Sequence, residues 1–142
     1  MRHPLHPALV HFPIACWSLA TAADLASLWW GRPAWMLAGV LLVVGVVTAL
    51  AAMATGMIEL SKVGGDHPAI RDLNRHMLLA MAAWSLYAAS LFLRLQGSAL
   101  ARPDAIALAL GVTGFICLCA TGWLGGTLVY GHGLGMRGPP RT

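Results

Sequence analysis

Four long apolar stretches constrain the fold of this chain more than any other feature of its sequence. Mostly apolar residues fill positions 8–30, 33–60, 73–95 and 104–130. Each stretch is long enough to cross a bilayer, because a membrane-spanning helix needs about 20 apolar residues. Only 10% of the residues are charged, whereas soluble domains carry roughly 25%. The sequence therefore predicts an all-α bundle of four transmembrane helices, forming a single membrane domain over residues 1–142.

Charge and cysteine content exclude several other classes of protein. The net charge of +4 is small and spread along the chain, so it does not form the basic patch of a nucleic-acid-binding protein. Cys16, Cys117 and Cys119 all lie in apolar stretches, which favours packing roles and implies no disulfide framework. Histidines and prolines interrupt the start of the first stretch, unlike a cleavable signal peptide, so we expect this stretch to remain as a helix.

Basic residues are distributed unequally between the two sides of the predicted bundle. Four spans place both termini and the middle connection on one side. That side holds Arg2, Lys62, Arg71, Arg75, Arg137 and Arg141. The other side holds Arg32, Arg94 and Arg102. Because basic loops stay in the cytoplasm, this excess predicts cytoplasmic termini.

The two halves of the chain are faintly similar, which suggests duplication. His11, a Trp-Ser-Leu string, an Ala-Thr-Gly string and His67 recur at offsets of 65, 67, 66 and 65. The matching positions begin at His11 and His76, Trp17 and Trp84, Ala54 and Ala120, and His67 and His132. Each half would be a helical hairpin, and an axis along the membrane normal would relate the two. Such an axis would bring His11 and His76 together.

Small and charged residues within the spans indicate how the helices pack. Gly122 and Gly126 have the small-xxx-small spacing that lets helices approach closely, and span two carries a similar stripe of Gly45, Ala49, Ala52 and Gly56. We expect tight packing or assembly into an oligomer through these glycine-rich helices, with a slot for a flat cofactor as the alternative. Asp24 lies inside span one, and we expect it to pair with Arg94 because charges inside a membrane need partners.

All six histidines fall on the side that holds the termini, although even placement would scatter them over both sides. They are His3, His6, His11, His67, His76 and His132. Two neutral imidazoles from facing helices can hold a haem iron axially. Lys62, Arg71 and Arg75 lie at the level where haem propionates need cations, and Glu59 could act as a metal ligand or a proton carrier. The alternative is a set of interfacial histidines that bond to a carbonyl or to Glu59.

Two end motifs resemble the DUF2231 family of bacterial membrane proteins. The first is His6-Pro7-Ala8-Leu9-Val10-His11-Phe12-Pro13-Ile14; the second is Gly122-Trp123-Leu124-Gly125-Gly126 with Leu128-Val129-Tyr130 and His132-Gly133. The resemblance spans nearly the whole chain and implies a compact four-span protein of the bacterial inner membrane. It carries over His6, His11 and His132, and His76 less distinctly, whereas Gly131 stands where the family pattern has a larger, often basic residue. Redox modules near some relatives favour electron transfer.

The leading hypothesis is a b-type cytochrome-like electron carrier with a single haem b. His11 and His76 would be its axial ligands, with His6 and His132 as supporting or alternative ligands. The protein would be a redox carrier or a subunit of a membrane oxidoreductase. It would exchange electrons with a partner protein or a quinone, and its other contact would be the lipid bilayer.

Two other functions remain open from the sequence. One is a non-haem site for copper, zinc or iron, because imidazole suits all three metals. Its ligands would be drawn from His6, His11, His76, His132 and Glu59. The other is an accessory subunit without a cofactor, in which the histidines bond to the backbone and the glycine-rich helices assemble with a larger complex.

Overall fold

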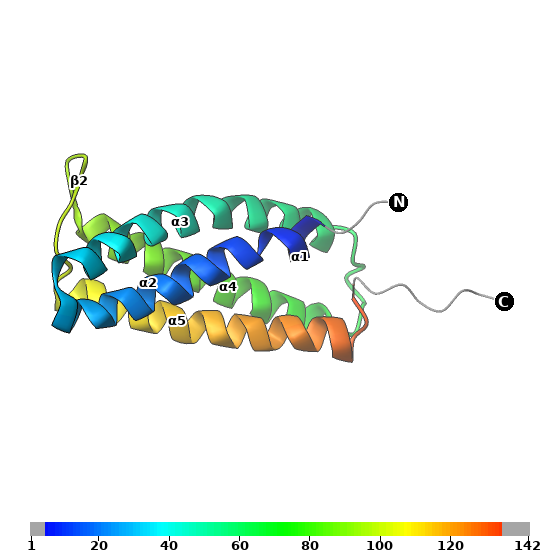
Figure 1. Ribbon diagram of the computed structural model, residues 1–142. Helices are drawn as coiled ribbons and strands as arrows, with labels where there is room; N and C mark the ends of the chain where they lie inside the picture. Colours follow the sequence, from blue (N-terminus) through cyan, green and yellow to red (C-terminus); the bar gives the residue numbers. More distant parts are fainter. Residues whose placement is uncertain (1–4, 135–142) are drawn as a thin grey trace.

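The computed structural model describes residues 5–134 and shows an all-α bundle, which confirms the predicted fold class (Figure 1). The helices are α1 (Leu5–Leu9), α2 (His11–Trp30), α3 (Arg32–Leu60), α4 (Ile70–Leu93) and α5 (Ala105–Gly126), and a turn of π-helix, η1 (Thr127–Gly131), continues α5. Four helical segments are long and apolar enough to cross a membrane: His6–Trp30, Arg32–Leu60, Ile70–Leu93 and Ala105–Gly131. Arg2, His3, Arg137 and Arg141 lie outside the described residues.

The first span is divided into α1 and α2 at Val10. Pro13 has no backbone N–H, so it cannot donate to the carbonyl one turn earlier, which weakens the helix at this point. The neighbouring bonds persist, because the Val10 N–H donates to the His6 carbonyl at 3.1 Å and the Ile14 N–H to the Val10 carbonyl at 3.2 Å. The short α1 packs against α3, and this contact positions His6.

Short connections join the helices into two hairpins. Gly31 links α2 to α3 in a left-handed conformation, with φ +63°, which glycine adopts without the strain of a side chain. The link from α4 to α5 contains a small antiparallel pair, β1 (Leu95–Gln96) and β2 (Ala99–Leu100). The α5 helix then begins at Asp104, whose side chain accepts a hydrogen bond from the Ala107 N–H at 2.7 Å.

The hairpins α2–α3 and α4–α5 each pack closely along their length, and they meet through α3 with α4 and α2 with α5. The bundle thus has two distinct ends (Figure 1). We call the end with Gly31 and the β1–β2 pair the turn end. We call the other end, with residues 61–69 and η1, the histidine end.

The centre of the bundle is built around one aromatic pair. Trp17 of α2 stacks on Tyr87 of α4, with ring centroids 4.7 Å apart, and both side chains are buried. The hydroxyls of Thr21 and Tyr87 share a 2.9 Å hydrogen bond. Leu42 and Ala49 of α3 complete this core, which joins the two hairpins.

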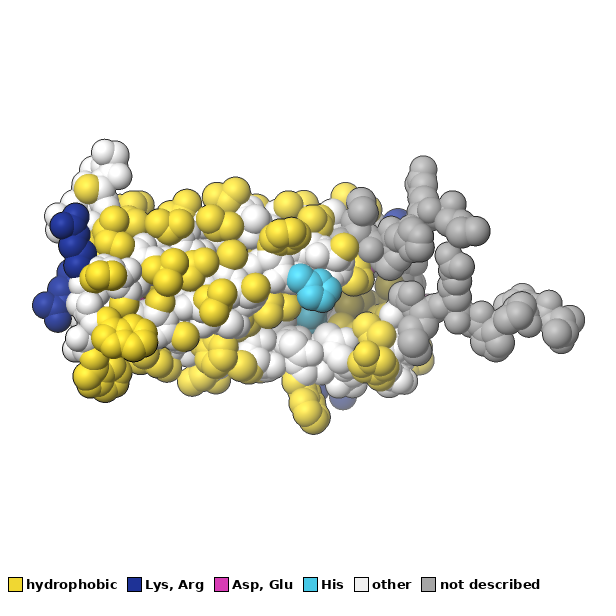
Figure 2. Space-filling model, in the orientation of Figure 1, with side chains coloured by type: hydrophobic (Ala, Val, Ile, Leu, Met, Phe, Trp, Pro, Cys, Tyr) yellow, Lys and Arg dark blue, Asp and Glu magenta, His cyan; other side chains and the backbone are white. Residues whose placement is uncertain are grey.

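The outside of the bundle is apolar, as a surface in contact with lipid must be. Figure 2 shows hydrophobic side chains along the length of the visible face, with basic side chains at the turn end and others, partly hidden, toward the histidine end. Large aromatic side chains project outward, among them Trp29, Trp30, Trp123 and Tyr130. Trp29 and Trp30 end α2 and Tyr130 lies in η1, so these three lie at span ends, where amphipathic aromatic rings favour the membrane interface.

Asp24 and Arg94 form a buried ion pair near the turn end, which confirms the pairing expected from sequence. Both guanidinium NH groups donate to the Asp24 carboxylate at 2.8 Å. Ser90 supports the pair, because its carbonyl accepts from Arg94 Nε at 3.2 Å and its hydroxyl accepts from Arg94 NH2 at 3.0 Å. The Arg94 side chain is only 1% exposed, so these bonds replace water for it.

Candidate functional site

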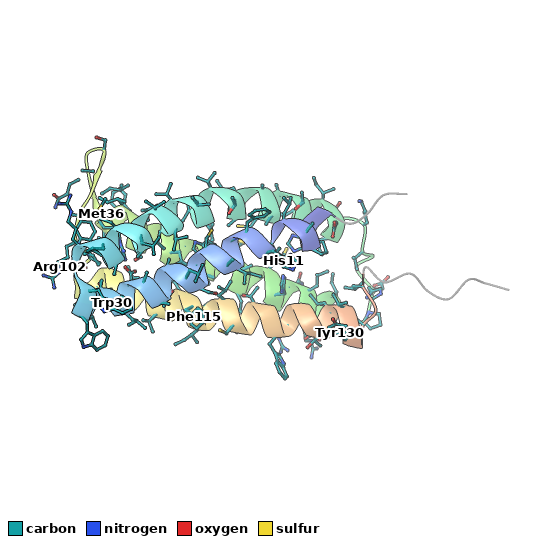
Figure 3. The ribbon with its side chains drawn as sticks, in the orientation of Figure 1. His11, Trp30, Met36, Arg102, Phe115 and Tyr130 are labelled. Atoms are coloured by element: carbon teal, nitrogen blue, oxygen red, sulfur yellow. The ribbon has the colours of Figure 1, made fainter. Side chains whose placement is uncertain are left out.

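The structure places the predicted site residues at the histidine end, where Figure 3 labels His11. His6 lies on α1 and His76 on α4, while His11 begins α2. His132 directly follows η1, and Glu59 lies in the last turn of α3. Contacts and burial divide these residues into groups with different roles.

His76 reaches from α4 to the backbone of α5. Its Nδ1 lies 3.0 Å from the carbonyl oxygen of Thr121, and its ring is half-buried. Gly125 lies beneath the ring, where a Cβ atom would sit 3.4 Å from His76 Cε1. This is an ordinary van der Waals distance, so the imidazole lies against α5 without requiring glycine there.

His6 makes the same arrangement in the first hairpin, between α1 and α3. Its Nδ1 lies 2.7 Å from the carbonyl oxygen of Ala52. Gly56 lies beneath its ring, and a Cβ atom there would sit 2.9 Å from both Cε1 and Nδ1 of His6. The backbone N–H of His6 also donates to Glu59 Oε1 at 3.3 Å. The alternative in which interfacial histidines bond to a carbonyl or to Glu59 therefore describes His6 well.

The contacts make His6, rather than His11, the counterpart of His76. In each hairpin the glycine lies four residues after the carbonyl that the histidine binds, Ala52 before Gly56 and Thr121 before Gly125. The two sites are therefore related by offsets of 69 to 70 residues, not by the 65 to 67 of the short matching strings. The spacing of Gly56 and Gly125 carries the offset that relates the two sites, whereas the Ala-Thr-Gly strings indicate a different alignment of the two halves.

Both histidines are held in the tautomer that ligates metals. A carbonyl oxygen can only accept a hydrogen bond, so Nδ1 carries a proton in His6 and in His76, which leaves Nε2 as the ring nitrogen that a metal could bind. Within residues 5–134, no hydrogen bond engages Nε2 of either ring. An Nδ1–H bonded to a carbonyl is the usual support for a histidine ligand.

His11 and His67 bond to nearby backbone groups and do not share the contacts of His6 and His76. His11 is exposed on α2, on the side of the bundle that faces the viewer in Figure 3. Its Nδ1 lies 3.4 Å from the Ala8 carbonyl oxygen in its own span. His67 accepts a hydrogen bond from the Ala69 N–H at 3.1 Å and so stabilises the start of α4.

His132 forms a separate cluster with Asp72, a residue that the sequence did not single out. His132 Nε2 lies 3.1 Å from Asp72 Oδ2, and Arg75 lies 3.5 Å from Asp72 Oδ1. The only hint in the sequence is the position of Asp72, in the first turn of a helix, where acidic residues are favoured. Lys62 and Arg71 are exposed at this same end.

The structure does not gather the predicted metal ligands into one site. Across residues 5–134, no group of three or more His, Cys, Asp and Glu side chains is placed to hold a metal ion. Glu59, for example, contacts the backbone N–H of His6. The histidine end supplies two imidazoles in matching settings, and not the three or four gathered ligands that a zinc site needs.

The two glycine stripes have different surroundings. On α3, Gly45 lies under Trp17 and Gly56 under His6, so this stripe serves the close packing expected from sequence. On α5, a Cβ atom at Gly122 or Gly126 would meet nothing within 4 Å. These two glycines line a shallow apolar groove with Trp123 and Tyr130 on the outside of the bundle.

Comparison with known proteins identifies one family. A family model described as "Predicted membrane protein (DUF2231)" matches residues 2–138. No curated protein and no solved structure matches the chain. The family description agrees with the four apolar helices and adds no chemistry to the histidine pair.

Proposed function

The chain belongs to the DUF2231 family of predicted membrane proteins, and from its geometry we propose that it is a b-type cytochrome-like electron carrier. His6 and His76 would hold its haem. The observation that carries this proposal is the matched pair of imidazoles, each with Nδ1 bonded to a backbone carbonyl and Nε2 unengaged by the described residues. His6 thus replaces His11 in the pair that the sequence suggested.

The residues present fit a haem better than a bare metal ion. A haem iron takes four ligands from its own macrocycle and needs only two from the protein, and the histidine end supplies two matched imidazoles. A glycine lies beneath each ring. At Gly56 a Cβ atom would press against His6, whereas at Gly125 it would make an ordinary contact with His76. The close approach of the imidazole to a helix backbone therefore depends on glycine at Gly56.

When bound, the haem would supply a reversible one-electron change at its iron. The chain would contribute the orientation of both imidazoles, through the carbonyls of Ala52 and Thr121. It would exclude water with the apolar walls of the bundle and offer the exposed cations Lys62, Arg71 and Arg75 to the propionates. The histidine pair is near one membrane face, so electrons would be exchanged there with a partner protein or a quinone.

Absorption spectra of the purified protein test this proposal. We expect a Soret band that shifts, and resolved visible bands, when protein made with ample haem is reduced with dithionite. His6→Ala and His76→Ala should each lower haem content by at least ~10-fold, because even the loss of a supporting residue commonly weakens metal binding that much. His11→Ala is the matched control and should keep the haem, because His11 is exposed and outside the pair.

Two results would contradict the haem site. One is a featureless visible spectrum from the haem-replete protein. The other is unchanged haem content in His6→Ala or His76→Ala protein that is still folded by helical circular dichroism. Loss of haem in His11→Ala, with retention in His6→Ala, would restore the ligand pair first suggested by the sequence.

The second candidate is the accessory subunit without a cofactor, and the same two bonds favour it. In this function, the histidines tie α1 to α3 and α4 to α5 through the backbone carbonyls that they bind. This function requires a colourless protein. Its His6→Gln and His76→Gln variants should assemble normally, because the glutamine amide can still donate to the same carbonyls.

We also propose that both termini face the cytoplasm. Arg94 is buried and paired with Asp24, so it is not a free loop charge, and the turn end keeps only Arg32 and Arg102. The basic excess at the histidine end is therefore larger than the sequence count implied. A fluorescent protein fused to the C-terminus should fluoresce and a fused alkaline phosphatase should be inactive; the reverse pattern would overturn this orientation.

A further inference from the structure

Polar contacts between the two hairpins are concentrated in the turn-end half of the bundle. Asp24 of α2 binds Arg94 after α4. The Thr21 and Tyr87 hydroxyls bond to each other, and Trp84 Nε1 donates to the Val46 carbonyl at 3.2 Å. We call this set of contacts the clamp. It comprises Asp24, Arg94, Thr21, Tyr87, Trp17, Trp84 and the Val46 carbonyl.

The polar contacts of the histidine end stay within single hairpins. His6 bonds to Ala52 and Glu59, all in the first hairpin. His76 bonds to Thr121, and His132 to Asp72, all in the second. Among the described residues, the side-chain hydrogen bonds and ion pairs of this end include none that joins one hairpin to the other.

On α3 and α4, burial follows the same gradient. On α4, the buried residues are Ala83, Tyr87 and Ser90, all in the half nearer the turn end. On α3, no residue after Ala52 is buried. The other helices do not share it, because Pro13 of α2, Thr121 of α5 and Leu128 of η1 are buried toward the histidine end. Fully buried side chains hold packed helices in one arrangement, so α3 and α4 are less constrained at the histidine end than at the turn end.

The path of α2 adds a geometric reason for this difference. Figure 1 shows α2 crossing the bundle obliquely, beside α5 near the turn end and closer to α3 at the end where α1 lies. The contacts agree, because α2 meets α5 while α1 packs on α3. The first hairpin therefore diverges from α5 toward the histidine end.

We infer that the hairpins pivot about the clamp and part at the histidine end, which admits a planar cofactor from the lipid between His6 and His76. The use of this opening by haem rests on the proposed function, whereas the pivot rests on the clamp alone. His6 and His76 belong to different hairpins, so a group bound to both would act as a second clamp and close the opening. Cofactor binding and rigidity of this end are thus coupled.

Distances between pairs of spin labels test the pivot in the whole protein. Cys16, Cys117 and Cys119 are first replaced by alanine. One pair, Phe12→Cys with Trp123→Cys, reports the histidine half of α2 and α5; the matched pair, Leu28→Cys with Ile106→Cys, reports the turn end. All four positions are exposed, so labels there leave the clamp and the histidine pair intact. Protein made without haem is measured by pulsed electron paramagnetic resonance, before and after addition of haemin.

We expect a broader distance distribution for the histidine-end pair than for the turn-end pair, and a narrower, shorter one after haemin. Narrow distributions for both pairs without haemin would overturn the pivot. A broad distribution that stays unchanged, while the absorption spectrum shows bound haem, would overturn the role of the opening in haem binding. If haemin does not bind at all, the proposed function fails, and the comparison of the two pairs alone still decides whether the hairpins pivot.

Discussion

Replacement of either partner of the Asp24–Arg94 pair is expected to destabilise the bundle by about 3–5 kcal/mol, because it leaves an unpaired charge in a buried site. The pair has two parallel bonds of 2.8 Å, and both side chains are almost fully buried. Each charge therefore depends on the other in place of water. Arg94→Ala also removes the hydrogen bond that Arg94 NH2 donates to the Ser90 hydroxyl. The effect is measured as the free energy of unfolding in mixed micelles, from the loss of helical circular dichroism.

A double replacement separates the cost of an unpaired charge from the value of the pair. Asp24→Leu with Arg94→Leu should recover most of the stability lost in either single variant, since apolar residues can substitute for a whole buried ion pair. Arg94→Lys should recover little, because an ammonium cannot match the two-pronged contact. A single variant as stable as the wild type, or a double variant worse than the sum of both, would show that the pair does not stabilise the bundle in this way.

The fold could be predicted because few backbone structures are stable inside a lipid bilayer. A backbone in a bilayer must satisfy its hydrogen bonds internally, so four apolar stretches of sufficient length imply four helices. The same reasoning paired Asp24 with Arg94, because a charge inside a span requires a partner. These predictions depend on composition and length, which the sequence displays directly.

The arrangement of the histidines could be predicted only in part. The topology alone places all the predicted histidines at one end of the bundle. The match between His76 and His6, however, depends on the rotation of each helix about its axis and on which helix it packs against. The short strings matched three to five residues away from the structural register, which is about one helical turn. Nothing in the local sequence reveals that α1, which carries His6, rests on α3. The role of the pair remains a prediction.

Gly45→Ala is expected to destabilise the bundle by about 1–3 kcal/mol, the usual cost of an extra methyl group in a well-packed core. A Cβ atom at this position would lie 2.5 Å from Cδ1 of Trp17 and would overlap its Nε1. The indole cannot move aside, since Trp17 is only 4% exposed and is stacked on Tyr87. A methyl group here therefore forces α2 and α3 apart at the level of the clamp.

Gly122→Ala is the matched control, because a Cβ atom there meets nothing within 4 Å. Alanine favours the helix over glycine by up to about 1 kcal/mol, so this variant should be as stable as the wild type or more so. Trp17→Ala in the Gly45→Ala background should cost less than the sum of the two single changes, because it removes both Cδ1 and Nε1, the atoms that the new methyl group would overlap. Equal stability of Gly45→Ala and Gly122→Ala would mean that α2 and α3 do not approach as closely as the structure has them. The helix contact that positions the clamp would then be wrong.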